Sequence, residues 1–215
     1  MELKLSHLPA AGAGGAYPAS GDAFLAKTGA ARDAYNRASL SAQHVLAVWN
    51  QATGRCDASL AAACGSSPGA PARISALLER PTSDGLPPDL LQARFSQFRE
   101  ESFHIVPRAA DALATGDLAR FGDLVDRSQH LAETCLHNQV PETIALARRA
   151  RQLGAHAASA FGAGFGGSAW ALVPSGDAPA FLEAWQREYA REFPGRAPAA
   201  SFFLSGAGGG ARRVG

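Results

Sequence analysis

Apolar residues recur at intervals of three and four through most of the chain, which is the spacing of one face of an α-helix. The longest such run covers residues 29–51 and ends before Gly54, a typical helix stop. Another extends from Leu90 to Ile105, and Pro107 beyond it requires either a kink or a restart of the helix. Further helices are predicted at residues 57–64, 73–79, 118–132, 141–153 and 179–193.

Capping residues stand at the ends of several of these runs. Asp57, Asp117 and Asp177 each precede a predicted helix, where a carboxylate accepts hydrogen bonds from the first-turn N–H groups. Gly116 and Gly154 follow predicted helices, where glycine adopts the left-handed conformation that ends a helix. These caps support the helix boundaries that the apolar spacing predicts.

Three apolar runs are too short for helices, and they are predicted to be strands: 157–161, 169–173 and 200–205. The helix predicted at 179–193 lies between the second and the third strand. This order of strand, loop, strand, helix and strand on a predominantly helical framework predicts an α+β fold.

The two ends of the chain differ from its body. Residues 1–26 are rich in glycine and alanine, with AAGAGGAYPASG at positions 10–21. Their apolar residues follow neither the helical nor the strand spacing, so a mobile segment is expected there. No strand pattern leads into this stretch, which argues against a nucleotide-binding loop. One domain is predicted over residues 27–205, and residues 206–215 are expected to be a flexible tail.

Composition and charge exclude several function classes. The 215 residues are 47% hydrophobic and 18% charged, with a net charge of +1, so no nucleic-acid-binding surface is expected. Three cysteines without CxxC spacing argue against a disulfide framework or a zinc site and favour a reduced compartment. No apolar run is long enough for a membrane span and no secretory leader is evident, so a cytoplasmic location without membrane contact is predicted.

The glycine-dense stretch GAGFGGS at positions 162–168 is the main candidate for chemistry. Its four glycines permit positive φ, so main-chain N–H groups can point toward one anion with no Cβ in the way. The residues predicted to bind or brace phosphate are Gly162, Ala163, Gly164, Phe165, Gly166, Gly167 and Ser168. A tight turn without a ligand is the open alternative.

Two known phosphate-binding motifs do not fit this stretch. A dinucleotide-binding GxGxxG needs a helix to begin inside the motif, whereas residues 168–173 are strand-like and are followed by Pro174. A Walker A loop needs a lysine before its serine, and Gly167 occupies that position before Ser168.

The stretch GAHAASAFGAGFGGSAWALV at positions 154–173 resembles the third signature motif of the GHMP kinases, and the galactokinase branch is the most similar. Upstream, ARFGDLVDRS at 119–128 and the pair Pro141–Glu142 resemble two further galactokinase segments. The resemblance covers residues 27–204 and is strongest over 95–173. The departures from the family pattern are Gln129 for histidine, Thr143–Ile144 for Leu-Asp, and Ser168 for cysteine.

This resemblance implies a C-terminal kinase domain with a small antiparallel sheet and helices against it. It implies ATP-dependent phosphorylation of a sugar, with ATP and Mg²⁺ as cofactors, and a glycine loop that braces the nucleotide site of the other domain. Arg37 follows Tyr35 and Asn36 as in a galactokinase "Y-N-x-R" segment, so an inter-domain position is implied. A solvated helix arginine is the open alternative for Arg37.

The family places its nucleotide motif, its Mg²⁺-ligating acid and its catalytic aspartate in an N-terminal half. No carboxylate of this chain aligns with those roles, so no catalytic residue and no metal ligand is assigned. We therefore expect a truncated or partial kinase that is inactive alone and needs an N-terminal kinase domain as its partner. A non-catalytic ligand-binding or regulatory module is the alternative, and the sugar and the oligomeric state stay open.

Other polar residues carry weaker signals. Ser128, His130 and Glu133 have the residue types of a hydrolytic triad, but neighbours on one helix point in different directions. The arginines near the end of the helix at 141–153 complement the helix dipole. Isolated histidines without partners at metal spacing are His44, His104 and His156.

Overall fold

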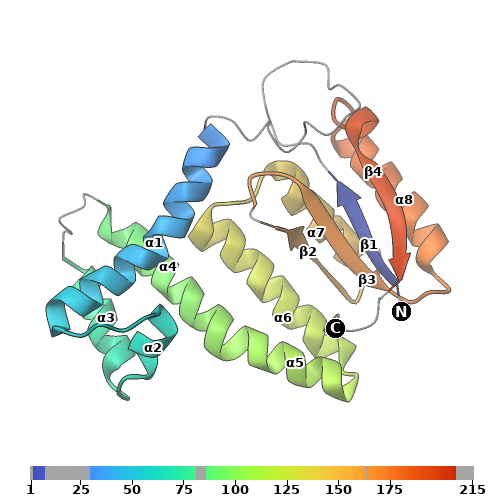
Figure 1. The fold of residues 1–215 in the computed structure, drawn as a ribbon. Coiled ribbons are helices and arrows are strands. Elements are labelled where there is room, and N and C mark those ends of the chain that lie inside the picture. Colours follow the sequence, from blue (N-terminus) through green and yellow to red (C-terminus); the bar gives the residue numbers. More distant parts are fainter. Residues whose placement is uncertain (1, 8–29, 81–85, 163, 207–215) are drawn as a thin grey trace, which may run out of the picture.

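The computed structural model describes residues 2–7, 30–80, 86–162 and 164–206 (Figure 1). For residues 2–7 and 30–39 it describes the backbone path alone. The predicted tail at 207–215 and most of the segment predicted to be mobile, residues 8–26, lie outside the described residues. Both therefore stay predictions.

Four helices form the first part of the molecule: α1 (Ala30–Thr53), α2 (Leu60–Gly65), α3 (Ala70–Leu78) and α4 (Pro88–Glu100). Their apolar faces meet in one core, in which Val45, Ile74, Leu78 and Phe95 are almost completely buried. The predicted helices at 29–51 and 73–79 are confirmed. Both sequences place their apolar residues on one face of a helix, and packing such a face into a core stabilises the helix.

A long helical line leads from α4 through a π-helical turn, η2 (Glu101–Ile105), into α5 (Val106–Thr115). The N–H of Val106 donates to the carbonyl of Glu101, the wide spacing that defines a π turn. Pro107 lies in the first turn of α5, directly after this π turn. Ile105 and Val106 both have right-handed helical backbone angles, so the chain passes Pro107 through a π turn within a nearly continuous helical line (Figure 1).

The helices of the second part are α6 (Leu118–Leu131), followed by the π turn η3 (Ala132–Leu136), α7 (Pro141–Gln152) and α8 (Ala178–Glu192). A short 3₁₀ turn, η4, covers Ala197–Ala199. Gly116 has φ +73° and Asp117 Oδ1 accepts from the N–H of Arg120 at 3.0 Å, as predicted for a helix stop and an N-cap. Asp177 is the N-cap residue of α8, without a side-chain hydrogen bond.

The described strands form one antiparallel sheet in the order β2-β3-β1-β4 (Figure 1). They are β1 (Glu2–His7), β2 (Ala157–Phe161), β3 (Ser168–Val173) and β4 (Ser201–Gly206). The three strands predicted from the sequence are confirmed.

Strand β1 contradicts the expectation that residues 1–26 lack regular structure, and it also leads into the glycine-rich stretch where no strand was expected. Its partners, β3 and β4, lie at the far end of the chain, with Leu5 opposite both Trp170 and Phe203. A six-residue strand gives little local signal, and only these distant neighbours reveal it.

Both faces of the sheet are buried at strands β2 and β3. On one face, Ala158, Ala169 and Ala171 pack against α7 and α8, where Trp185 is completely buried and its Nε1 donates to the carbonyl of Leu146 at 3.0 Å. On the other face, Ala157 and Leu172 pack against Val125 of α6, with partly buried apolar side chains beside them. Strands β2 and β3 are therefore held between two layers of helices.

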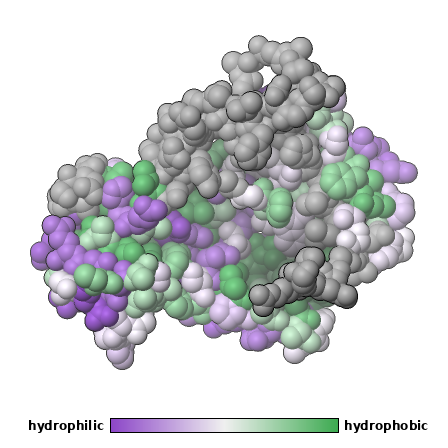
Figure 2. Space-filling view, in the orientation of Figure 1, coloured by the Kyte–Doolittle hydropathy of each residue, from purple (hydrophilic) through white to green (hydrophobic). Residues whose placement is uncertain are grey.

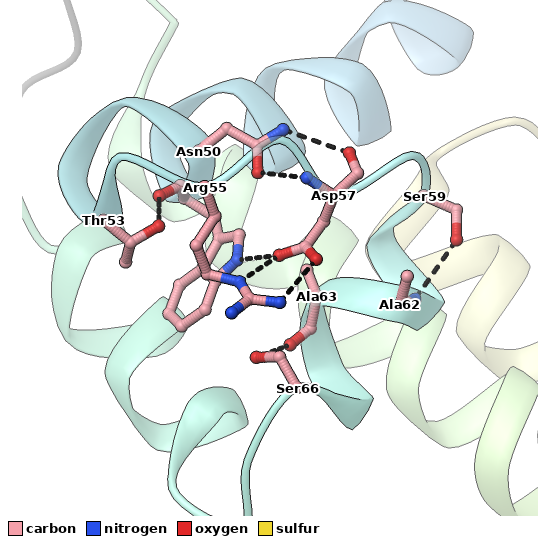
Figure 3. Close-up of polar contacts among 9 residues, drawn as sticks. Asn50, Thr53, Arg55, Asp57, Ser59, Ala62, Ala63 and Ser66 are labelled. Carbon is pink, nitrogen blue, oxygen red and sulfur yellow. Dashed lines mark hydrogen bonds and ion pairs between the residues drawn. The ribbon is translucent and has the colours of Figure 1, made fainter.

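Asp57 is not the N-cap of α2, as the sequence suggested. Ser59 has that position, and its Oγ accepts from the N–H of Ala62 at 3.1 Å. The carboxylate of Asp57 instead accepts from Trp49 Nε1 at 2.7 Å and from the guanidinium of Arg55 at 2.7 and 2.8 Å (Figure 3). These donors stabilise the ionised form and hold the pKa of Asp57 at about 2.

The low pKa of Asp57 predicts a pH-dependent contribution to stability. A lowered folded-state pKa stabilises the fold above the unfolded-state value of about 3.9, and this stabilisation is lost as the pH falls toward about 2. Asp57→Asn should lower the melting temperature at pH 7, and the gap to the wild type should narrow as the pH is lowered below about 4. Thermal unfolding followed by circular dichroism across this pH range measures the gap.

Asp111→Asn is a matched control, since Asp111 is an exposed carboxylate on α5. It should change the melting temperature little at any pH. If the difference in melting temperature between Asp57→Asn and the wild type did not depend on pH, the charge of the Asp57 carboxylate would not be the source of the stabilisation.

Tyr189 of α8 offers a second test of the core. Its side chain is 3% exposed and its hydroxyl has no hydrogen-bond partner among the described residues. Burial, with a smaller contribution from Glu142, raises the pKa of Tyr189 to about 12. Because an unpaired buried hydroxyl is unfavourable, Tyr189→Phe should raise the free energy of unfolding by about 1 kcal/mol. Chemical denaturation measures this free energy of unfolding. A clear loss of stability in Tyr189→Phe would mean that the hydroxyl has a hydrogen-bond partner.

Candidate functional site

The glycine-dense stretch is the connection between β2 and β3. The last paired residues are Phe161 and Ser168, so residues 162–167 form the loop between the strands. Gly162, Gly164, Gly166 and Gly167 have φ values of 91°, 82°, 105° and 107°. The conformational prediction is thus confirmed for the four glycines, since these angles favour residues without a Cβ. Ala163 lies outside the described residues.

Phe165 also adopts a left-handed conformation, with φ 60°. A bulky residue rarely does so, and the surroundings must hold it there. The N–H of Phe165 donates to the main-chain carbonyl of Asn138, which lies between η3 and α7. This amide is therefore bonded within the protein and is not a donor for a ligand.

Gly164 packs directly against the same residue. A Cβ at position 164 would overlap the carbonyl oxygen of Asn138 and lie 2.7 Å from its Cγ and Nδ2 atoms. The sequence suggested that a side chain at 164 would intrude on a ligand concavity. The structure instead shows the protein's own residue 138 in that direction.

Gln129 holds the end of β2 just before the loop. This buried side chain accepts at Oε1 from Ser159 Oγ at 2.9 Å and from the N–H of Ala160 at 2.8 Å. Its Nε2 donates to Glu133 at 2.8 Å. Gln129, the departure from the family's histidine, thereby connects α6 to the outer edge of the sheet, a role that the sequence analysis missed.

Arg151 and Gly122 hold the other end of β2. Arg151 Nη1 donates to the carbonyls of Ala155 at 2.6 Å and His156 at 2.5 Å, and its Nε donates to Asp126 at 2.9 Å. A Cβ on Gly122 would overlap the His156 carbonyl, so α6 approaches the strand as closely as a glycine allows. The helix-dipole explanation is therefore incomplete for Arg151.

The remaining candidates are not brought together as a catalytic set. Ser128 Oγ donates to the carboxylate of Glu101, at 2.9 and 3.1 Å to its two oxygens, while Glu133 is bonded to Gln129. Within the described part of the chain, no three His, Cys, Asp or Glu side chains lie close enough to hold a metal ion. Arg37 lies on α1, where only the backbone path is described.

Residues 109–191 match the family described as "GHMP kinases C terminal". This segment is a GHMP kinase C-terminal domain. It runs from within α5 to the last turn of α8, and so contains both helix layers around β2 and β3, together with the glycine loop.

A solved galactokinase structure shares the fold over nearly all of this chain. Lactococcus lactis galactokinase complexed with galactose aligns with 99% of this chain and 47% of its own, at 22% identity and a TM-score of 0.67. L. major mevalonate kinase in complex with R-mevalonate aligns with 96% of this chain and 43% of its own, at 18% identity and a TM-score of 0.45. No curated protein matches the chain. The chain thus spans about half the length of the galactokinase whose fold it shares.

One large aromatic side chain is exposed beside the glycine loop. Phe161, the last residue of β2, is 61% exposed. On the face shown in Figure 2, hydrophobic residues are exposed over the middle of the molecule, and hydrophilic residues gather at the left, over α1 to α3.

Among the described residues, no helix is both long and apolar enough to cross a membrane. The cytoplasmic location stays a prediction.

The contact between Gly164 and Asn138 predicts unequal effects of two similar substitutions. Gly162 and Gly164 both have positive φ, but only Gly164 has an atom within 4 Å of its missing Cβ. Gly162→Ala should therefore cost about 1 kcal/mol of backbone strain. Gly164→Ala should cost about 1–3 kcal/mol more, because Asn138 must move. Chemical denaturation of the two variants measures the difference, and equal costs would rule out the close contact.

Proposed function

We propose that this chain is the C-terminal half of an ATP-dependent, galactokinase-like sugar kinase that transfers a phosphoryl group from ATP to a sugar hydroxyl. The observation that carries the proposal is the β2–β3 loop, in which four glycines adopt positive φ within a GHMP kinase C-terminal domain. The galactokinase-like segments at 119–128 and 141–142, together with the fold shared with Lactococcus lactis galactokinase, support a sugar kinase.

The loop's contribution to such a reaction is positioning and charge stabilisation. Phosphoryl transfer requires alignment of the donor with the acceptor and stabilisation of charge on the transferred group. We assign the phosphate contact to the main chain around Gly166 and Gly167, because the N–H of Phe165 is already bonded to Asn138. A charge-assisted hydrogen bond contributes roughly 1.5–3 kcal/mol, so two such bonds would lower the barrier substantially.

The residues present fit the phosphate end of ATP only in part. The glycines lack side chains that would block a phosphate, but the described residues offer no cluster of ligands for Mg²⁺. When bound, ATP with Mg²⁺ supplies the phosphoryl group and neutralises its charge. We therefore assign the metal ligands and the acceptor-activating group to an N-terminal kinase half, and we expect no turnover by the 215 residues alone.

A non-catalytic ligand-binding or regulatory module is the second candidate. The observation that favours it is the use of two departures from the family pattern, Gln129 and Thr143, in internal hydrogen bonds. Such a module would keep the fold and the loop and would bind a sugar or a nucleotide without transferring phosphate.

The test begins with the genomic DNA upstream of Met1. We expect an in-frame extension that encodes a Gly/Ser-rich nucleotide motif, and we expect the extended protein to phosphorylate a sugar with release of ADP. A coupled ADP assay over a panel of hexoses measures this, and the 215-residue chain is the inactive control. An extended protein that binds ATP or a sugar without turnover would favour the module, and one that binds neither would refute both candidates.

A further inference from the structure

A short polar relay connects the start of α7 to the glycine loop. Its first member is Thr143, a residue in the first turn of α7 whose side chain is 1% exposed. Its Oγ1 accepts from the N–H of Val140 at 3.2 Å and donates to Gln139 Oε1 at 2.9 Å, with the Val140 carbonyl at 3.0 Å as a second acceptor. A hydroxyl held in this way has a defined orientation.

The second member, Gln139, passes this orientation to Asn138. With its Oε1 bonded to Thr143, the amide group of Gln139 directs Nε2 toward Asn138 Oδ1 at 3.0 Å. That bond fixes the Asn138 side chain, whose Cγ and Nδ2 lie against Gly164. The side chain of Asn138 is therefore held from one side by Gln139 and packs on the loop with the other.

The main chain of Asn138 is placed independently by the end of η3. His137 adopts a left-handed conformation with φ 48°, and the N–H of Asn138 returns to the carbonyl of Ala132 at 3.4 Å. This turn directs the Asn138 carbonyl to the N–H of Phe165. Both parts of residue 138 thus contact the loop, at Gly164 and at Phe165.

A loop with four glycines needs such a support. Fixing the backbone of one residue costs about 1–2 kcal/mol of conformational entropy, and glycine loses the most freedom. If the loop were ordered only when a ligand binds, this cost would weaken binding. Contacts that order the loop beforehand remove that cost.

We propose that Asn138 is a positioning residue for the phosphate-binding loop, and that Gln139 and Thr143 hold it in place. This inference rests on the proposed function, because it assigns the loop to phosphate. It adds that the ligand-ready conformation of residues 164–167 is set by the segment between η3 and α7. Thr143 stands where the family pattern has leucine, and this departure supplies the hydroxyl that bonds Gln139.

The test compares Thr143→Val, which removes the hydroxyl at nearly constant volume, with Thr143→Ser, which retains it. Backbone order parameters of residues 164–167 are measured by NMR in the 215-residue chain, and tripolyphosphate is titrated as the probe. We expect Thr143→Val to lower the order parameters and to weaken tripolyphosphate binding about tenfold, as when the competent fraction falls to about a tenth. Thr143→Ser should restore both.

Two further variants keep the test decisive. Thr115→Val is the matched control, since the Thr115 hydroxyl donates to the Asp111 carbonyl on α5 and takes no part in the relay. It should leave the loop and the binding unchanged. Gln139→Ala breaks the relay without changing the buried side of α7 and should reproduce the effect of Thr143→Val if that variant folds poorly.

The outcomes separate this inference from the proposed function. Unchanged loop order in both Thr143→Val and Gln139→Ala would overturn the positioning role of the relay. A wild-type chain with an ordered loop, loosened by these variants, that binds no tripolyphosphate would support the relay and contradict the assignment of the loop to phosphate.

Discussion

The close approach of α6 to β2 is the contact on which the rest of this domain depends. It requires a residue without a Cβ at Gly122, because the carbonyl of His156 occupies that space. Arg151 then bonds the same carbonyl, and Gln129 bonds the far end of the strand. An outer strand normally exposes unpaired N–H and C=O groups. Here Gln129 of α6 accepts from the N–H of Ala160 in β2, and Arg151 of α7 bonds the carbonyls of Ala155 and His156 just before the strand, so β2 is held at both ends.

The glycine loop takes its conformation from this arrangement. Its first arm leaves β2 just after the residue bonded to Gln129, and its middle rests on Asn138. Neither support belongs to the loop itself. A kinase half built in this way would present a preordered backbone to its nucleotide, and the residues that determine its affinity would lie outside the glycine motif.

The helices, the three later strands and the positive φ of the four glycines were predictable from the sequence, because periodicity, caps and glycine content are local signals. Other features depend on distant residues. Asp57 had the position of an N-cap, yet Arg55 and Trp49 are stronger partners for its carboxylate. The roles of Gln129 and Asn138 could not be predicted, since an amide side chain carries no sign of which distant backbone groups it will meet.

Strand β1 lies in the interior of the sheet, yet both of its neighbours come from the final third of the chain. During translation β1 emerges before β3 and β4, and it has no partner in the sheet until they leave the ribosome. The helical bundle of α1 to α4 can form early, whereas the sheet must wait until β4 has been synthesised. Nascent chains should therefore leave the backbone N–H and C=O groups of β1 without strand partners until β4 is synthesised, a period in which chaperones that bind extended segments would protect it.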